Sequence, residues 1–124
     1  MANIIRFGGG SGIPSQIVRI GTRSATTHYR NSSYTTDNTY TIPDGVVYCI
    51  VNLTSGYSPG APWKSNKYIY KNGTVVLSNT SASAEMQWCG EVVPGDTIRI
   101  TTEVAEGDQE YAAYFVATVD GIVA

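Results

Sequence analysis

The chain has 124 residues, with eight Lys and Arg residues against ten Asp and Glu residues and a formal net charge of −2. A chain of this length is most economically one domain that buries a core without metal or disulfide support. The cations are scattered and form no basic stripe, which argues against nucleic acid as a partner. No apolar run reaches the roughly 18–20 residues of a membrane helix, and no export signal is readable, so we expect a soluble protein.

The composition favours β-structure. Thr, Val, Ile, Ser and Tyr are abundant, whereas leucine occurs only at Leu53 and Leu77. Stiff β-branched and aromatic side chains fit a pleated sheet and lose rotamer freedom in a helix. We therefore expect an all-β chain.

Residues 1–15 are predicted to form an N-terminal arm, and residues 16–124 the domain proper. A short apolar strand, Ile4–Phe7, runs into the glycine-rich sequence GGGSG at 8–12. Such a short strand is not stable alone, so it must pair with its own domain, a neighbouring subunit or another protein.

The next segments are a strand at 16–20 (QIVRI) and a polar stretch at 22–39 that is rich in Ser, Thr and Asn. The polar stretch is either a long surface loop or a pair of weak edge strands that contain Tyr29 and Tyr34.

The sequence TYTIPDGVVYCIVNL predicts a strand, a Pro-Asp-Gly turn and a second strand. Two-residue alternation gives the second strand one face with Val47, Cys49, Val51 and Leu53 and another with Val46, Tyr48 and Ile50. Cys49 and Cys89 are placed on different faces of their strands, which argues against a disulfide between them, although two cysteines permit one.

Two β-rich runs joined by Asn72-Gly73 predict a hairpin with a type I′ turn. Counting outward pairs Tyr70 with Val75 and Tyr68 with Leu77, and we expect these four side chains on the inner face. The outer face would then carry Lys67, Ile69, Lys71, Thr74, Val76 and Ser78.

Three further elements complete the chain. In AEMQWCGEVV, Met86, Trp88 and Val92 are expected inside, and a Pro94-Gly95 turn leads to a strand with Ile98 and Ile100 inside and Arg99 and Thr101 outside. The final strand has an apolar face with Tyr111, Ala113, Phe115, Ala117 and Val119 and a second one with Ala112, Tyr114 and Val116.

Short strands separated by Gly, Pro and Asp turns predict one antiparallel β-sandwich of jelly-roll or immunoglobulin-like type. Two strands with apolar side chains on both faces exceed what one two-layer sandwich must bury, which suggests a homo-oligomer packed through one sheet. The expected assembly interface is made of Ile4, Ile5, Phe7, Val46, Tyr48, Ile50, Tyr114 and Val116.

The chain offers few groups for catalysis, and we expect no enzyme, no metal and no cofactor. His28 is the only histidine and lacks a His/Cys cluster around it, and the GGGSG run precedes a β-rich segment rather than the helix that a phosphate loop requires. A carboxylate pair for sugar hydrolysis drawn from Glu85, Glu91 and Glu103 is the remaining enzymatic alternative.

The loop GYSPGAPWKSN at 56–66 carries the candidate ligand site. Tyr57, Trp63 and Lys64, with Tyr68 beyond them, could stack on a sugar ring or anchor a protein. Alternatively, Trp63 folds back and covers one end of the sandwich.

Four sequence features together resemble small virion proteins of tailed bacteriophages and prophages, namely decoration, head-fibre or tail-associated β-sandwiches. These features are the arm MANIIRFGGGSG, the polar NSSYTTDNTYTIPDG, the Asn-Gly hairpin and the strand VVPGDTIRI. The resemblance implies an oligomer, often a trimer, on a particle surface beside other virion proteins, with host glycan binding in some members; it supplies no catalytic residue.

We therefore expect a structural or adhesive module that self-assembles and docks through its arm, at the virion surface if a phage encodes it. The alternative is a carbohydrate-binding module that uses the Tyr57/Trp63 loop, and a glycan-active enzyme is the third possibility.

Overall fold

The computed structural model describes residues 3–5, 15–29, 32–58, 64–81, 83–106 and 111–124, of which 3–5, 15, 27–29, 32, 106 and 111 are described by their backbone alone. The chain is all-β, as predicted. Its nine described strands are β1 (Asn3–Ile5), β2 (Ser15–Tyr29), β3 (Ser32–Thr41), β4 (Val46–Ser58), β5 (Lys64–Lys71), β6 (Thr74–Asn79), β7 (Ala84–Glu91), β8 (Thr97–Glu106) and β9 (Tyr111–Val123).

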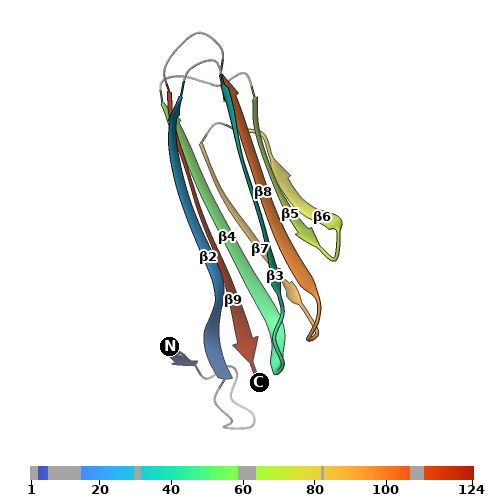
Figure 1. Ribbon diagram of the computed structural model, residues 1–124. Helices are drawn as coiled ribbons and strands as arrows, with labels where there is room; N and C mark the ends of the chain where they lie inside the picture. The colour runs from blue at the N-terminus through green and yellow to red at the C-terminus, as the bar shows by residue number, and fades with distance from the viewer. Residues whose placement is uncertain (1–2, 6–14, 30–31, 59–63, 82, 107–110) are drawn as a thin grey trace.

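The strands form two antiparallel sheets that pack face to face (Figure 1). The five-stranded sheet has the order β1-β2-β9-β4-β7, and the four-stranded sheet has the order β3-β8-β5-β6. From β2 to β9 the chain changes sheet at every connection except the β5–β6 hairpin. This is the strand order of a jelly roll, so the jelly-roll alternative is the correct one.

The core lies between the sheets and is built by alternate residues of the central strands. The described apolar residues exposed by 1% or less are Ile42, Val46, Cys49, Val51, Leu53, Ile69, Ile98, Val104 and Val119. Met86 is buried as expected, and Trp88 is partly buried against the same cluster. The inward positions predicted for Ile98 and Ile100 in β8 and for Phe115 and Val119 in β9 are confirmed.

Lys67 is buried among these apolar side chains, with none of its surface exposed. Its ammonium donates hydrogen bonds to the Ser65 Oγ at 2.8 Å and to the Ser81 carbonyl oxygen at 2.5 Å. Both acceptors are neutral. Burial therefore lowers the pKa of Lys67, because the charged form is poorly solvated there.

The described residues of the polar stretch, 22–29 and 32–39, lie in strands rather than in a loop. β2 continues through it to Tyr29, and β3 begins at Ser32. β3 is an edge strand of its sheet, which confirms the edge-strand alternative. Threonine-rich strands form here because one face of β3 points to solvent and needs no apolar side chain.

The predicted faces of β4 are wrong at its start. A register shift between Val46 and Tyr48 places Val46 in the core, 1% exposed, and leaves Val47 47% exposed. A β-bulge inserts one extra residue and so reverses the alternation on one side of it. Val46 is therefore not available for the predicted assembly interface.

The predicted faces of β5 are also wrong. Ile69 and Lys67 point inward, whereas Tyr68 and Tyr70 lie on the outer face. Tyr70 pairs with Val75 as expected, but a register shift pairs Ile69 with Leu77 and Tyr68 with Ser78.

The turn at Asn72-Gly73 has positive φ at both residues, 51° and 82°, as a type I′ turn requires. Asn72 also accepts a hydrogen bond from the Thr97 backbone N–H through its Oδ1 at 2.8 Å. This contact fixes the β5–β6 hairpin against β8.

The outer face of the five-stranded sheet keeps exposed apolar residues on β9, where Tyr114 and Val116 are 44% and 41% exposed. The ring of Tyr114 lies over Gly56, since a Cβ there would be 2.1 Å from the Tyr114 Cε1. Tyr48 and Ile50 lie on the same face and are half-buried. Four residues of the predicted interface, on β4 and β9, are thus at least partly open to solvent in the single chain: Tyr48, Ile50, Tyr114 and Val116.

The two cysteines are free, and Cys49 is buried while Cys89 is exposed. Their predicted placement on different faces is therefore confirmed. Burial, with smaller contributions from the charge of Asp120 and from Cys89, raises the pKa of the Cys49 thiol to about 11.

The N-terminal segment adds a short strand to the edge of the five-stranded sheet. β1 pairs with β2 in an antiparallel register that places Ile4 opposite Gln16. The side chains of Ile4 and Ile5, and all of Phe7, lie outside the described residues, so their predicted interface role stays a prediction.

Candidate functional site

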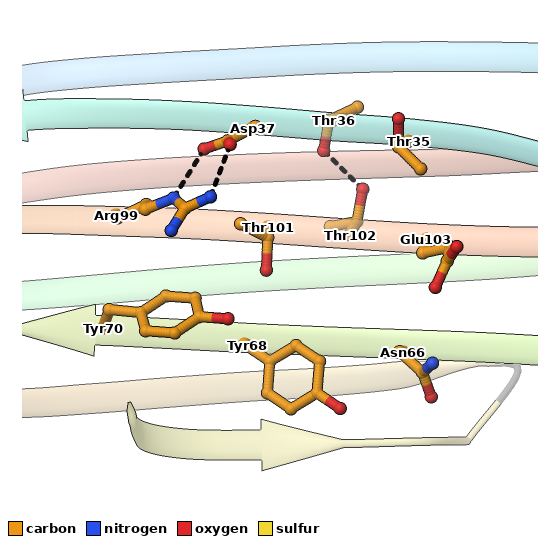
Figure 2. A pocket seen from close by; sticks show the side chains of 10 residues that line it. All are labelled: Thr35, Thr36, Asp37, Asn66, Tyr68, Tyr70, Arg99, Thr101, Thr102 and Glu103. Atoms are coloured by element: carbon orange, nitrogen blue, oxygen red, sulfur yellow. Dashed lines mark hydrogen bonds and ion pairs between the residues drawn. The ribbon is translucent and has the colours of Figure 1, made fainter. Parts of the chain in front are cut away.

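An open groove lies on the outer face of the four-stranded sheet and has a volume of about 340 Å³. β3, β8 and β5 each contribute the side chains of successive outward positions, and Figure 2 shows them gathered along one stretch of the sheet. The lining residues are Thr35, Thr36, Asp37, Asn66, Tyr68, Tyr70, Arg99, Thr101, Thr102 and Glu103. We call this feature the four-stranded groove.

The cross-strand register explains why these side chains meet. Asp37 of β3, Thr101 of β8 and Tyr68 of β5 form one row across the sheet. Thr35, Glu103 and Asn66 form the next row. Side chains of one row share a face and lie within contact distance of their neighbours.

Arg99 is held between an acid and an aromatic ring. Its Nε and Nη2 donate to the two Asp37 carboxylate oxygens at 2.8 and 2.7 Å. Its guanidinium carbon lies 5.2 Å from the centre of the Tyr70 ring, within cation–π range. Figure 2 shows the guanidinium between these two partners.

This arrangement keeps both groups charged. The hydrogen bonds donated by Arg99 lower the pKa of the Asp37 carboxyl, and the positive charge adds to the effect, while slight burial opposes it. The hydrogen bond to Asp37 likewise raises the pKa of Arg99. The two-point contact also fixes the plane of the guanidinium, which is a geometry that lysine could not reproduce.

Two tyrosine rings line the β5 side of the groove. The ring centroids of Tyr68 and Tyr70 lie 6.0 Å apart, and the rings are tilted by 41°. Tyrosine gives a rigid apolar surface with a polar hydroxyl at its end. Successive outward positions on one strand therefore create two adjoining stacking surfaces.

Polar side chains complete the groove. Asn66 and Thr101 offer neutral donors and acceptors, and Glu103 lies 3.7 Å from the ammonium of Lys64. The Thr36 and Thr102 hydroxyls share a buried hydrogen bond beneath the surface. Their hydroxyls thus bond to each other, and the outward-facing residues carry the recognition chemistry.

The structure separates the residues of the predicted ligand site. Tyr68 lines the four-stranded groove, and Lys64 lies on the same face through its ion pair with Glu103. Tyr57 lies in the other sheet and packs against a buried cluster that contains Val104 and Phe115. Trp63 lies outside the described residues, so both of its predicted roles stay open.

Of the ten lining residues, only Tyr68 belonged to the predicted ligand site, and the nine that were missed include Asp37, Tyr70 and Arg99. The outward direction of Arg99 was predicted correctly, and that was one usable signal. Tyr70 was missed because the β5 alternation was placed on the wrong face. Asp37 was missed because 22–39 was not resolved into strands.

The carboxylates proposed for sugar hydrolysis do not lie together. Glu85 and Glu91 lie on β7, six positions apart, which is about 20 Å at roughly 3.3 Å per residue. Glu103 belongs to the other sheet.

Among the described residues, no three His, Cys, Asp or Glu side chains are grouped as metal ligands. No helix in the described part of the chain has the length and hydrophobicity needed to cross a bilayer.

No protein-family model matches the chain, and no curated protein sequence matches it. Among solved structures, a Bacillus endospore appendage pilus protein is similar at a TM-score of 0.43 and 12% identity, over 97% of this chain and 100% of that one. A protein of infectious bursal disease virus, Gx strain, is similar at 0.44 and 10%, over 99% of this chain and 37% of that one. A family 16 carbohydrate-binding module is similar at 0.38 and 10%, over 99% and 85%. These weak similarities assign no function.

Proposed function

We propose that the chain is a non-catalytic β-sandwich module that binds glycans through the four-stranded groove. The observation that carries the proposal is the pair of adjoining tyrosine rings, Tyr68 and Tyr70, beside the fixed Arg99–Asp37 pair. Sugar rings have apolar faces that stack on aromatic rings and hydroxyl groups that bond to charged and amide side chains.

The charge of the groove favours a sugar over a nucleic acid. Stacking surfaces on a sheet also bind nucleotide bases, but such sites need free cations that track the phosphates. Here Arg99 is paired with Asp37 and Lys64 with Glu103. No cation of the groove is left to neutralise a backbone.

We propose that the groove binds glycans without hydrolysing them, for two reasons. Asp37 is already bound by a guanidinium, which removes it as a proton donor. Glu103 is then the one lining carboxylate that is not held by a two-point contact with a cation. Glycoside hydrolysis by the usual route needs two carboxyl groups.

The test replaces Tyr68 and Tyr70 singly by alanine. Wild-type protein is first screened on a glycan array, and a soluble oligosaccharide that binds is then titrated calorimetrically. We expect each variant to lose about tenfold in affinity, because an aromatic stacking contact is worth roughly 1–3 kcal/mol where nucleotide bases bind, and a sugar face uses the same ring surface. The Tm is expected to fall by only a few degrees, because both rings lie outside the core and the loss of each should cost about 1 kcal/mol.

The matched control is Tyr48→Ala, which removes a half-buried tyrosine from the opposite sheet. It should keep the affinity of the wild type. A wild-type protein that binds no glycan, or groove variants that bind as well as Tyr48→Ala does, would refute the proposed function.

A second candidate function is self-assembly through the outer face of the five-stranded sheet. Tyr114 and Val116 support it, because two large apolar side chains are more than 40% exposed on one strand. On this proposal the chain is a homo-oligomer, docks by its N-terminal arm to other virion proteins and belongs to the surface of a phage particle. The support for that location is the sequence resemblance.

For this candidate we expect Val116→Glu to lower the oligomeric state, because a charge buried in an interface is poorly solvated. Sedimentation at micromolar concentration measures the change. Val75→Glu is the control, since Val75 is 46% exposed on the other sheet. A wild-type protein that is monomeric throughout this range would contradict the assembly.

A further inference from the structure

We propose that the four-stranded groove selects uncharged glycan chains and rejects anionic ones, because its lining cation, Arg99, and the neighbouring Lys64 are each paired with a carboxylate of the groove. The inference rests on the proposed function and adds the class of sugar. It follows from the positions of four charged side chains: Asp37, Arg99, Lys64 and Glu103.

The first pair involves Arg99. Two of its N–H donors are bonded to Asp37 at 2.7–2.8 Å, in the fork that a sugar carboxylate or sulfate would also need. An anionic sugar that used this fork would have to displace Asp37, and one that bound the remaining donors would place its charge beside the Asp37 carboxylate. A neutral hydroxyl needs only one of the guanidinium donors that Asp37 leaves free.

The second pair involves Lys64. Its ammonium lies 3.7 Å from the Glu103 carboxylate, and the two side chains are 51% and 38% exposed. This exposed contact is weak as a source of stability. It nevertheless cancels the charge of Lys64 and places a second carboxylate along the groove.

The four charges therefore sum to zero, and the two carboxylates can only accept hydrogen bonds. A ligand that fits must bring donors, and hydroxyl groups do so. A uronic acid or sulfated sugar brings further acceptors and a like charge, which disfavours binding through repulsion. The neutral amide of Asn66 and hydroxyl of Thr101 do not compensate for that repulsion.

The test compares neutral oligosaccharides with uronates of the same sugar configuration. The probes are β-1,4-linked mannan oligosaccharides against β-1,4-linked oligomannuronates, each immobilised at equal density, because this pair differs in charge but not in linkage. We expect the wild type to bind a neutral member and to bind its uronate counterpart more weakly by about tenfold or more. Affinity for the neutral member should change less than about twofold between about 0.05 and 0.5 M NaCl.

Asp37→Asn and Glu103→Gln test the origin of the selectivity, since each removes one negative charge without changing side-chain size. Each variant should gain uronate affinity by about tenfold, because it leaves Arg99 or Lys64 unpaired. Glu85→Gln, which removes one exposed negative charge from β7 in the other sheet, is the control and should gain none. Circular dichroism and the Tm establish that each variant is folded.

The outcomes separate the two levels of inference. If the wild type prefers a uronate, the charge inference is wrong while glycan binding stands. If the wild type prefers the neutral chain but neither charge variant gains uronate affinity, the ion pairs are not its cause and the inference is overturned. If no probe and no array glycan binds the wild type, the proposed function itself fails.

Discussion

Replacing Ile69 by alanine is expected to lower the free energy of unfolding by about 2–5 kcal/mol. Ile69 has no exposed surface and lies between Ile100 of β8 and Leu77 of β6 in the register of the four-stranded sheet. Alanine would remove its buried methyl and methylene groups and leave a cavity. Denaturant unfolding followed by tryptophan fluorescence measures the loss, with an unchanged m-value as the sign that compactness is retained.

The matched variant is Tyr70→Ala, one residue along the same strand. Tyr70 lies on the outer face and contacts Arg99, so its loss should cost only about 1 kcal/mol. The sequence-based placement, with Tyr70 inside and Ile69 outside, predicts the opposite result: a larger loss of unfolding free energy for Tyr70→Ala than for Ile69→Ala. A larger loss for Tyr70→Ala would therefore favour that placement over the one in the structure.

Lys67→Met is expected to raise the free energy of unfolding at neutral pH by about 1–3 kcal/mol. The lysine ammonium is fully buried, and its two acceptors carry no charge that would offset the lost hydration. Methionine retains most of the apolar stem and removes the charge. After the substitution, water can replace the ammonium as the hydrogen-bond donor to the Ser81 carbonyl oxygen, because Ser81 itself is exposed.

The advantage of Lys67→Met should shrink as the pH rises. Burial lowers the folded pKa of Lys67 below its usual value of 10.5, so between the two values the unfolded chain binds more protons. The contribution of Lys67 to stability therefore becomes less unfavourable with increasing pH in that window, and it is most unfavourable below the folded pKa.

The measurement is the difference in unfolding free energy between Lys67→Met and wild type, from about pH 7 to about pH 10. Taking the difference removes the alkaline effects of Cys49 and Tyr40, whose raised folded pKa values are common to both proteins. Lys64→Met is the control, because Lys64 is exposed and its replacement removes no buried charge. A variant less stable than wild type would mean that the two hydrogen bonds outweigh the cost of the buried charge.

Much of the fold could be predicted because alternation on β8 and β9 is regular. Ile98 and Ile100, and Phe115 and Val119, share inward faces without any interruption between them. The incorrect start of β4 lies at a register shift, where Val47 is the extra residue and exchanges the faces on one side of the bulge. No local composition signal marks that position. β5 alternates regularly, and the extra residue of its hairpin, Val76, lies on β6. Its faces were exchanged because the tyrosines were expected inside and Lys67 outside, whereas Lys67 and Ile69 are buried.

The groove could not be predicted from the sequence, because its rows of side chains come from strands that are distant along the chain. Asp37 and Arg99 are separated by 62 positions, and their pairing follows from the order β3-β8-β5. Alternation predicts which way a side chain points from its own strand. It does not predict which strand lies next to it.

The position of β9 has a consequence for biosynthesis. β9 lies between β2 and β4, yet it is translated after both. While the ribosome is still making the chain, β2 and β4 have no central strand to join them, whereas the β5–β6 hairpin can already close. The larger sheet therefore assembles after β9 emerges, and until then chaperones or neighbouring nascent chains meet two long strands with open edges.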